Sequence, residues 1–185
     1  MKKHFHIQDI ILITIIALIF GAIFVGTDYL YNVLSLAVGP FANEILYGIW
    51  IMAGPLAIYL TRIPGAAIVG EVLGAIAEVL FGGTFGISIL FSGIIQGAGT
   101  ELGFAAWRYK NWGWSSLLAS AVTTTIVAFA YDLFRLGYAR YSIGMLAALF
   151  SVRLISIIFF GAILVHSIFA LLNRAHALRH LGPEK

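Results

Sequence analysis

Hydrophobic positions run in long blocks along the chain, and short breaks rich in Gly, Pro, Asn and charged residues separate the blocks. A membrane-spanning helix needs roughly 20 mostly apolar residues, which is close to the length of each block. Gly and Pro at the breaks are typical helix-ending signals. The pattern predicts six membrane helices over residues 8–31, 42–61, 64–82, 86–109, 114–136 and 143–173.

The breaks are short, so neighbouring helices should run antiparallel in one compact bundle. We therefore predict an all-α, polytopic membrane protein in which residues 1–185 form a single six-helix transmembrane domain. Composition agrees, because 61% of the residues are hydrophobic and 10% are charged, whereas a soluble domain carries roughly 25% charged residues. The length leaves no room for a sizeable soluble domain.

The distribution of Lys and Arg predicts how the bundle sits in the membrane. With the N-terminus inside, the inner segments hold Lys2, Lys3, Arg62, Arg108, Lys110, Arg174, Arg179 and Lys185. The outer segments hold Arg135 and Arg140. This excess of positive charge inside places both termini in the cytoplasm of a cell, expected to be prokaryotic. The basic residues form no single patch, so nucleic acid is not an expected partner; the lipid bilayer is.

Several chemical functions lack their sequence motifs. There is no GxxxxGK[ST] phosphate loop, no HExxH, no GxSxG, and no cysteine at all. We therefore predict no enzyme activity, no cofactor and no metal site.

Glu71 and Glu78 form the most unusual polar feature within the predicted spans. Seven residues rotate an α-helix by about 700°, close to two full turns, so both carboxylates share one face. Gly74 and Ala75 lie between them and would allow a ligand or another helix to approach closely. Each glutamate could instead be neutral or paired with an arginine that ties helices together. Glu78, nearer the predicted outer end, is the better candidate ligand contact.

A second polar stripe follows in the helix predicted over residues 86–109. Gln96 lies near its middle, on the same stripe as Ser88 and Ser92. An amide both donates and accepts hydrogen bonds, which suits the edge of a heteroaromatic ring. The alternative is hydrogen bonding between helices, a common use of Ser and Gln in membrane bundles.

Aromatic and acidic residues cluster near two predicted outer helix ends. Glu44, Tyr47 and Trp50 share a face and could form a wall that stacks on a flat, cationic ligand. Tyr and Trp at such positions also serve as interface anchors. Tyr131 and Asp132 could face the same pocket, although Asp132 could instead pair with a neighbouring arginine three residues away.

Two further features concern packing. Arg153 lies deep in the last predicted helix and needs an acidic partner; Glu78 and Asp132 are nearest in predicted depth. In the first helix, Thr14, Ala17 and Gly21 form a stripe of small residues. Such a stripe serves either internal helix packing or docking of another membrane protein.

Three runs carry a family resemblance: "NEILYGIWIMAGPLAIYLTRIPGAA", "GEVLGAIAEVLFGG" and "GISILFSGIIQGAGTELGFA". Together with the six-span layout, they resemble the YkoE family of S components, the substrate-binding subunits of energy-coupling factor (ECF) transporters. The similarity extends from about Phe41 to Trp107.

The resemblance implies uptake of thiamine or of its hydroxymethylpyrimidine precursor (HMP). It also implies two kinds of partner: a transmembrane coupling (T) component and two cytoplasmic ATPase subunits. S components often dock through an Ala-x-x-x-Ala face on the first helix, which Ala17-x-x-x-Gly21 matches with one small-for-small change. The acids, the amide and the aromatic side chains singled out above complement the aminopyrimidine and the thiazolium of thiamine.

Three other interpretations stay open at this point. In a stand-alone proton-coupled carrier, Glu71, Glu78, Glu101 and Asp132 would form a proton relay. An intramembrane enzyme would need a nucleophile or metal set, and none is visible. A purely structural assembly subunit would have no pocket lined by the acidic face.

Overall fold

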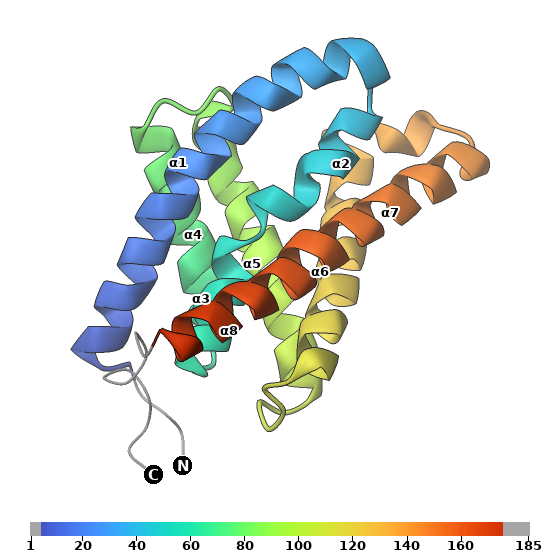
Figure 1. Cartoon of the computed structure of the whole chain (residues 1–185). Helices are drawn as coiled ribbons and strands as arrows, with labels where there is room; N and C mark the ends of the chain where they lie inside the picture. Colours follow the sequence, from blue (N-terminus) through green and yellow to red (C-terminus); the bar gives the residue numbers. More distant parts are fainter. Residues whose placement is uncertain (1–4, 176–185) are drawn as a thin grey trace.

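A computed structural model describes residues 5–175 of the chain, which form helices joined by short loops (Figure 1). No strand occurs in this part of the chain, so the predicted all-α class is confirmed. The elements are α1 (Ile7–Val38), α2 (Phe41–Trp50), α3 (Ala53–Thr61), α4 (Ala66–Leu80), η1 (Gly86–Ser88), α5 (Ile89–Ala106), α6 (Trp114–Arg135), η2 (Tyr138–Arg140), α7 (Ile143–Ile157), the π-helical segment η3 (Ile158–Leu164) and α8 (Val165–Arg174).

These elements make the six predicted passes. The pair α2 and α3 forms the second pass, and α7, η3 and α8 form the last as one continuous helical rod. Within residues 5–175, five passes are long and apolar enough to cross a membrane. The sixth, α4, has 15 residues and so spans about 22 Å, less than the roughly 30 Å of a hydrocarbon core.

The second pass is interrupted at Ile51 and Met52, where α2 ends and α3 begins. Pro55 explains the break, because it lacks the N–H that would bond the Ile51 carbonyl and its ring clashes with that carbonyl. In α3 itself Pro55 lies in the first turn, where a missing N–H costs nothing. The sequence pattern predicts one helix over residues 42–61, and the structure divides it into two.

Small residues set the closest contact between α1 and α4. A Cβ atom added at Gly21 would overlap the side chain of Ala77 and come within 3.0 Å of the backbone nitrogen of Glu78. Gly21 therefore lets the two backbones approach more closely than any larger residue would. This approach fixes the position of Glu78 relative to α1.

The start of α1 and the end of α8 lie toward the same end of the bundle, as an even number of passes requires (Figure 1). The side of the membrane on which they lie remains a prediction from the charges. Four of those charges, Lys2, Lys3, Arg179 and Lys185, lie outside the described residues, as do the predicted domain limits 1 and 185.

Candidate functional site

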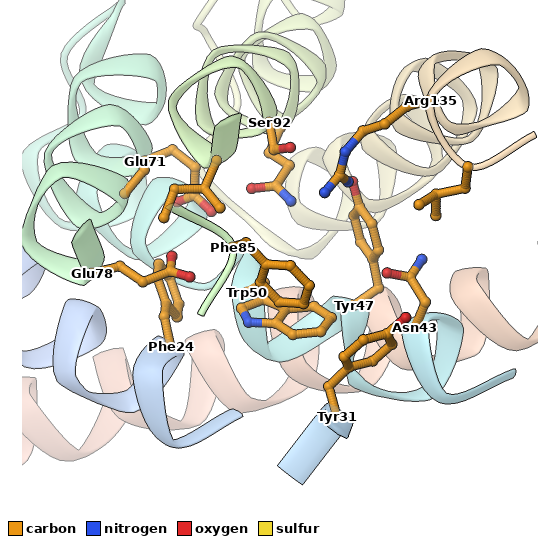
Figure 2. A pocket seen from close by; sticks show the side chains of 14 residues that line it. Phe24, Tyr31, Asn43, Tyr47, Trp50, Glu71, Glu78, Phe85, Ser92 and Arg135 are labelled. Carbon is orange, nitrogen blue, oxygen red and sulfur yellow. The ribbon is translucent and has the colours of Figure 1, made fainter. Parts of the chain in front are cut away.

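A cavity opens between α1, α2, α4 and α5, near the loop that follows α4 and the end of α6 (Figure 2). The space in this cavity that a water-sized sphere can occupy is about 60 Å³, less than the roughly 300–1,000 Å³ of most small-molecule sites. Its lining mixes aromatic, acidic and amide side chains: Phe24, Tyr31, Asn43, Tyr47, Trp50, Glu71, Ala75, Glu78, Phe85, Ile89, Ser92, Gln96, Arg135 and Leu136. Five of the eight predicted substrate contacts are among them, namely Tyr47, Trp50, Glu71, Glu78 and Gln96.

Glu71 is buried at the inner part of the cavity and is anchored to the backbone. Its Oε2 atom accepts a hydrogen bond from the backbone N–H of Gly54, which is free because α3 has just begun. Its Oε1 atom is buried and has no hydrogen-bond partner within residues 5–175. A buried polar atom without a partner is uncommon. Glu71 is thus held firmly and presents one free acceptor to the cavity.

Glu78 lies two turns further along α4 and meets a second acid, Asp28 of α1. Their side chains meet beside Gly83, where an added Cβ atom would lie 2.8 Å from Glu78 Cγ and 3.1 Å from Asp28 Oδ2. Asp28 is fully buried and accepts two hydrogen bonds: from the indole N–H of Trp50 at 3.1 Å and from the backbone N–H of Thr84 at 2.9 Å. Asp28 therefore ties α1, α2 and the loop after α4 together around Glu78.

Ser92 and Gln96 lie one turn apart on α5 and face the cavity from the side opposite α1. The Ser92 hydroxyl is buried and has no hydrogen-bond partner in the described part of the chain. The Gln96 amide is within hydrogen-bonding reach of the Tyr47 hydroxyl. The predicted polar stripe is therefore at the cavity, except for Ser88, which is exposed and donates to the Phe85 carbonyl.

Three rings form an aromatic wall. The ring centres of Tyr31 and Trp50 are 5.9 Å apart, those of Tyr31 and Phe85 are 5.4 Å apart, and those of Trp50 and Phe85 are 6.0 Å apart. These distances are typical of edge-to-face aromatic packing. Such a wall offers flat π surfaces to a planar or cationic ligand.

Glu44 and Asp132, predicted as substrate contacts, lie outside the cavity lining and serve Arg153 instead. The Arg153 Nη2 atom donates to Glu44 at 2.8 Å and to Asp132 at 2.7 Å, and its Nε atom donates to Glu44 as well. All three side chains are fully buried. The arginine must be compensated because an unpaired buried charge is very costly. Of the two partners predicted for Arg153, Asp132 is confirmed, whereas Glu78 is wrong and Glu44 takes its place.

The ion cluster of Arg153, Glu44 and Asp132 is linked to the cavity by residues that hydrogen-bond to Glu44. Tyr138 donates to Glu44 at 2.8 Å, and burial together with Glu44 raises the pKa of Tyr138, so the phenol remains a donor. Asn43 also donates its amide N–H to Glu44, at 2.9 Å. That bond fixes the amide orientation, so the carbonyl oxygen of Asn43 is the atom left for the cavity.

Tyr131 and the predicted docking stripe also differ from expectation. Tyr131 does not line the cavity; the Arg135 guanidinium lies 6.0 Å from its ring centre. Ala17 and Gly21 are buried inside the bundle, Gly21 against α4. Ala17 and Gly21 therefore serve internal helix packing, one of the two interpretations of the stripe. Thr14 is the exposed member of the stripe.

The sequence analysis missed Asp28, Tyr31, Asn43 and Phe85. Asp28 had a detectable signal, because it is a carboxylate inside the span predicted over residues 8–31. The others had none, since they reach the cavity from helix ends and a loop whose positions depend on tertiary packing. Among residues 5–175, no group of three or more His, Cys, Asp or Glu side chains is placed to hold a metal ion.

Comparisons with known proteins agree with this fold. The family model described as "ABC-type cobalt transport system, permease component" matches residues 8–127. The chain is 36% identical over 154 residues to YkoE of Bacillus subtilis (strain 168), provisionally named an HMP/thiamine permease protein; the match covers 83% of this chain and 77% of YkoE. A crystal structure of an S component of an ECF transporter superposes with a TM-score of 0.91 at 33% identity, covering 96% of this chain and 90% of the other.

The six-pass fold with a cavity between its helices defines an S component, the membrane-embedded subunit of an ECF transporter. More narrowly, the chain belongs to the YkoE family. It is a multi-pass protein of the cell membrane and part of a transport system.

Proposed function

We propose that this chain captures thiamine or HMP from outside the cell and releases it inside, with energy supplied by partner ATPases. The observation that carries the proposal is the free Oε1 atom of Glu71, buried in a cavity that also holds an aromatic wall. An aminopyrimidine has ring-edge donors and acceptors for Glu71, Ser92 and Gln96, and a flat face for the aromatic rings. A bare metal ion, such as the cobalt of the family description, would have no use for such a wall.

The proposed partners are a transmembrane T component and two cytoplasmic ATPase subunits. The likeness to an S component of an ECF transporter supports this assembly. The chain itself contains no phosphate loop, so its transport cycle depends on ATP hydrolysed by another subunit. Ala17 and Gly21 face inward, so we propose that the exposed side of α1, which includes Thr14, is the part of this helix available to a partner.

A stand-alone proton carrier is the less favoured alternative. Two of its four relay carboxylates are engaged in structural contacts. Glu101 accepts hydrogen bonds from the backbone N–H groups of Gly65, at 2.6 Å, and Ala67, at the start of α4. Asp132 is paired with Arg153. A relay through these groups would have to break the contacts that hold the bundle together.

Equilibrium binding of thiamine and of HMP to the purified, detergent-solubilised protein tests the proposal. We expect both to bind, and we expect Glu71→Gln to weaken both by about tenfold or more, since a buried ligand group would lose its charged partner. Asp9→Asn, a carboxylate change in α1 away from the cavity, is the control. Absence of binding by both ligands would overturn the proposal.

Reconstitution separates the transport mechanisms. In proteoliposomes that contain this chain alone, we expect no uptake under a pH gradient, and uptake only after the T component and the ATPases are added with ATP. Uptake by the chain alone would favour the proton-coupled carrier. Mass spectrometry of the small molecule that copurifies with the protein would identify the ligand directly.

A further inference from the structure

Asp28 and Glu78 are two acidic side chains in contact with each other, and this contact requires a proton. Two carboxyl groups held this close together repel each other strongly when both are ionised, so the pair retains one proton. The geometry enforces the contact: both side chains lie against Gly83, and Asp28 is fixed by the N–H groups of Trp50 and Thr84. The two acids therefore form a site that holds one proton and one negative charge.

The charges around this pair leave the proton as its only positive charge. No ion pair to Asp28 or Glu78 occurs within residues 5–175. Figure 2 shows Arg135, the cation of the cavity lining, on the side opposite Glu78. The other titratable groups on α1, α4 and the helices packed against them are Asp9, Tyr29, Tyr31, Glu44, Tyr47, Tyr59, Glu71 and Glu101. Tyr31 and Tyr47 line the same cavity, and Asp9 lies at the start of α1. Glu71 faces the same cavity, whereas Glu44 serves Arg153, Tyr59 contacts His166 and Glu101 holds the start of α4.

We infer that Asp28 and Glu78 form the subsite for the positive charge of a cationic heteroaromatic ligand, and that this charge replaces the shared proton. The inference rests on the proposed function and selects between its two ligands. Thiamine carries a permanently positive thiazolium ring, and HMP lacks it. On binding, the O–H bond of the carboxyl pair breaks, the proton passes to water and buffer, and the thiazolium takes its place.

Electrostatic competition is the physical reason for this exchange. A positive charge placed beside a carboxyl group favours its ionised form, so a thiazolium beside the pair favours loss of the shared proton. Removing the proton without a cation would leave two like charges side by side in a buried site. Trp50, which donates to Asp28 and belongs to the aromatic wall, offers a π face beside the same subsite. Glu71 and Ser92, each with a free atom, are left for the pyrimidine edge that both ligands share.

Titration calorimetry of the wild-type protein tests the exchange directly. Binding of thiamine and of HMP is measured near neutral pH in two buffers that differ in ionisation enthalpy. We expect thiamine binding to release about one proton, with affinity rising about tenfold per pH unit while the pair holds its proton. We expect HMP binding to release none. Thiamine binding without proton release, equal release by both ligands, or binding of HMP alone would each overturn the inference while leaving the proposed function standing. Failure of both ligands to bind would overturn both.

Glu78→Gln identifies the source of the proton. The amide can donate to Asp28 without an extra proton, so the variant should bind thiamine with no proton release. Glu78 is the better position to change, because Asp28 accepts two further hydrogen bonds that an asparagine would disturb. Asp9→Asn is the matched control and should keep the wild-type release. Unchanged release in Glu78→Gln would show that another group supplies the proton and would overturn the inference.

Discussion

The guanidinium carbon of Arg153 lies 3.9 Å from the centre of the Tyr47 ring. Tyr47 lines the cavity and Arg153 does not, so the ring is the boundary between the ligand site and the buried ion cluster. The cation–π contact stabilises the position of the Tyr47 ring, and the salt bridges of Arg153 to Glu44 and Asp132 keep the guanidinium in place. Three helices, α2, α6 and α7, thus determine where one wall of the cavity stands.

Replacing Arg153 with methionine should destabilise the protein strongly. Glu44 and Asp132 would remain buried without their cation, and breaking a buried pair in this way costs about 3–5 kcal/mol. Thermal unfolding in detergent measures the loss. Arg140→Met, at an exposed position in η2, is the control and should change stability by less than about 0.5 kcal/mol.

A variant that removes all three charges together tests the same explanation. Arg153→Met combined with Glu44→Gln and Asp132→Asn removes all three charges together, so it should recover much of the lost stability. If the triple variant is no more stable than Arg153→Met alone, unpaired charge is not the cause of the loss.

Gly21→Ala should destabilise the contact between α1 and α4. The added methyl group meets the Ala77 side chain and the backbone around it, and overpacking of this kind typically costs about 1–3 kcal/mol. Gly26→Ala, five residues along the same helix, has nothing within 4 Å of the added atom. It should be neutral or slightly stabilising, because alanine favours a helix.

The two alanine variants should also differ in thiamine affinity. Gly21 fixes the spacing between Glu78 and Asp28, so the affinity for thiamine should fall in Gly21→Ala and stay unchanged in Gly26→Ala. Melting temperature and ligand affinity, measured on both variants, test this. Equal behaviour of the two variants would count against close packing at Gly21.

Ser92→Ala should separate affinity from stability. The Ser92 hydroxyl is buried and has no hydrogen-bond partner among the residues that the structure describes, so its removal leaves none of their polar groups unsatisfied and stability should stay unchanged. A ligand that bonds this hydroxyl should lose about 1 kcal/mol, or roughly fivefold in affinity. Ser88→Ala, on the exposed η1 turn, is the control for both measurements. A stability loss without an affinity loss would assign Ser92 a packing role.

Tryptophan fluorescence should report ligand entry through Trp50. Of the four tryptophans, Trp50 lines the cavity, whereas Trp107 is 45% exposed and lies outside it. A ligand stacked on the aromatic wall should quench the emission of the wild-type protein and of Trp107→Phe. Trp50→Phe should remove most of this quenching. Undiminished quenching in Trp50→Phe would place the ligand elsewhere.

The sequence predicts the helical layout well because lipid imposes a length and a polarity on every pass. The break near Pro55 could also be predicted from the sequence, because a proline disrupts the helical turn before it whatever the tertiary packing. The end of α1 was not predicted correctly. The predicted helix ends at residue 31, but no glycine or proline interrupts the chain between Thr27 and Val38, and the helix continues to Val38.

The cavity was predicted in part, for a related reason. Spacing on one helix shows which residues share a face, and it brought out Glu71 with Glu78, and Tyr47 with Trp50. Spacing does not show which distant helix covers that face. Glu44 shared a face with the aromatic residues, yet its partner Arg153 lies 109 positions away in the sequence. Contact of the lining residues with a ligand stays a prediction.

The hydrogen bond from the Gly54 backbone to Glu71 has a consequence for sequence variation among relatives. Any residue except proline has the N–H that this bond uses, so the bond itself places almost no demand on position 54. Size does, because a Cβ atom there would lie 3.0 Å from the Ala67 carbonyl oxygen and 3.1 Å from the Glu71 carboxylate. The anchor of the carboxylate can therefore survive while every surrounding side chain changes, provided that position 54 stays small and the helix break before it is kept.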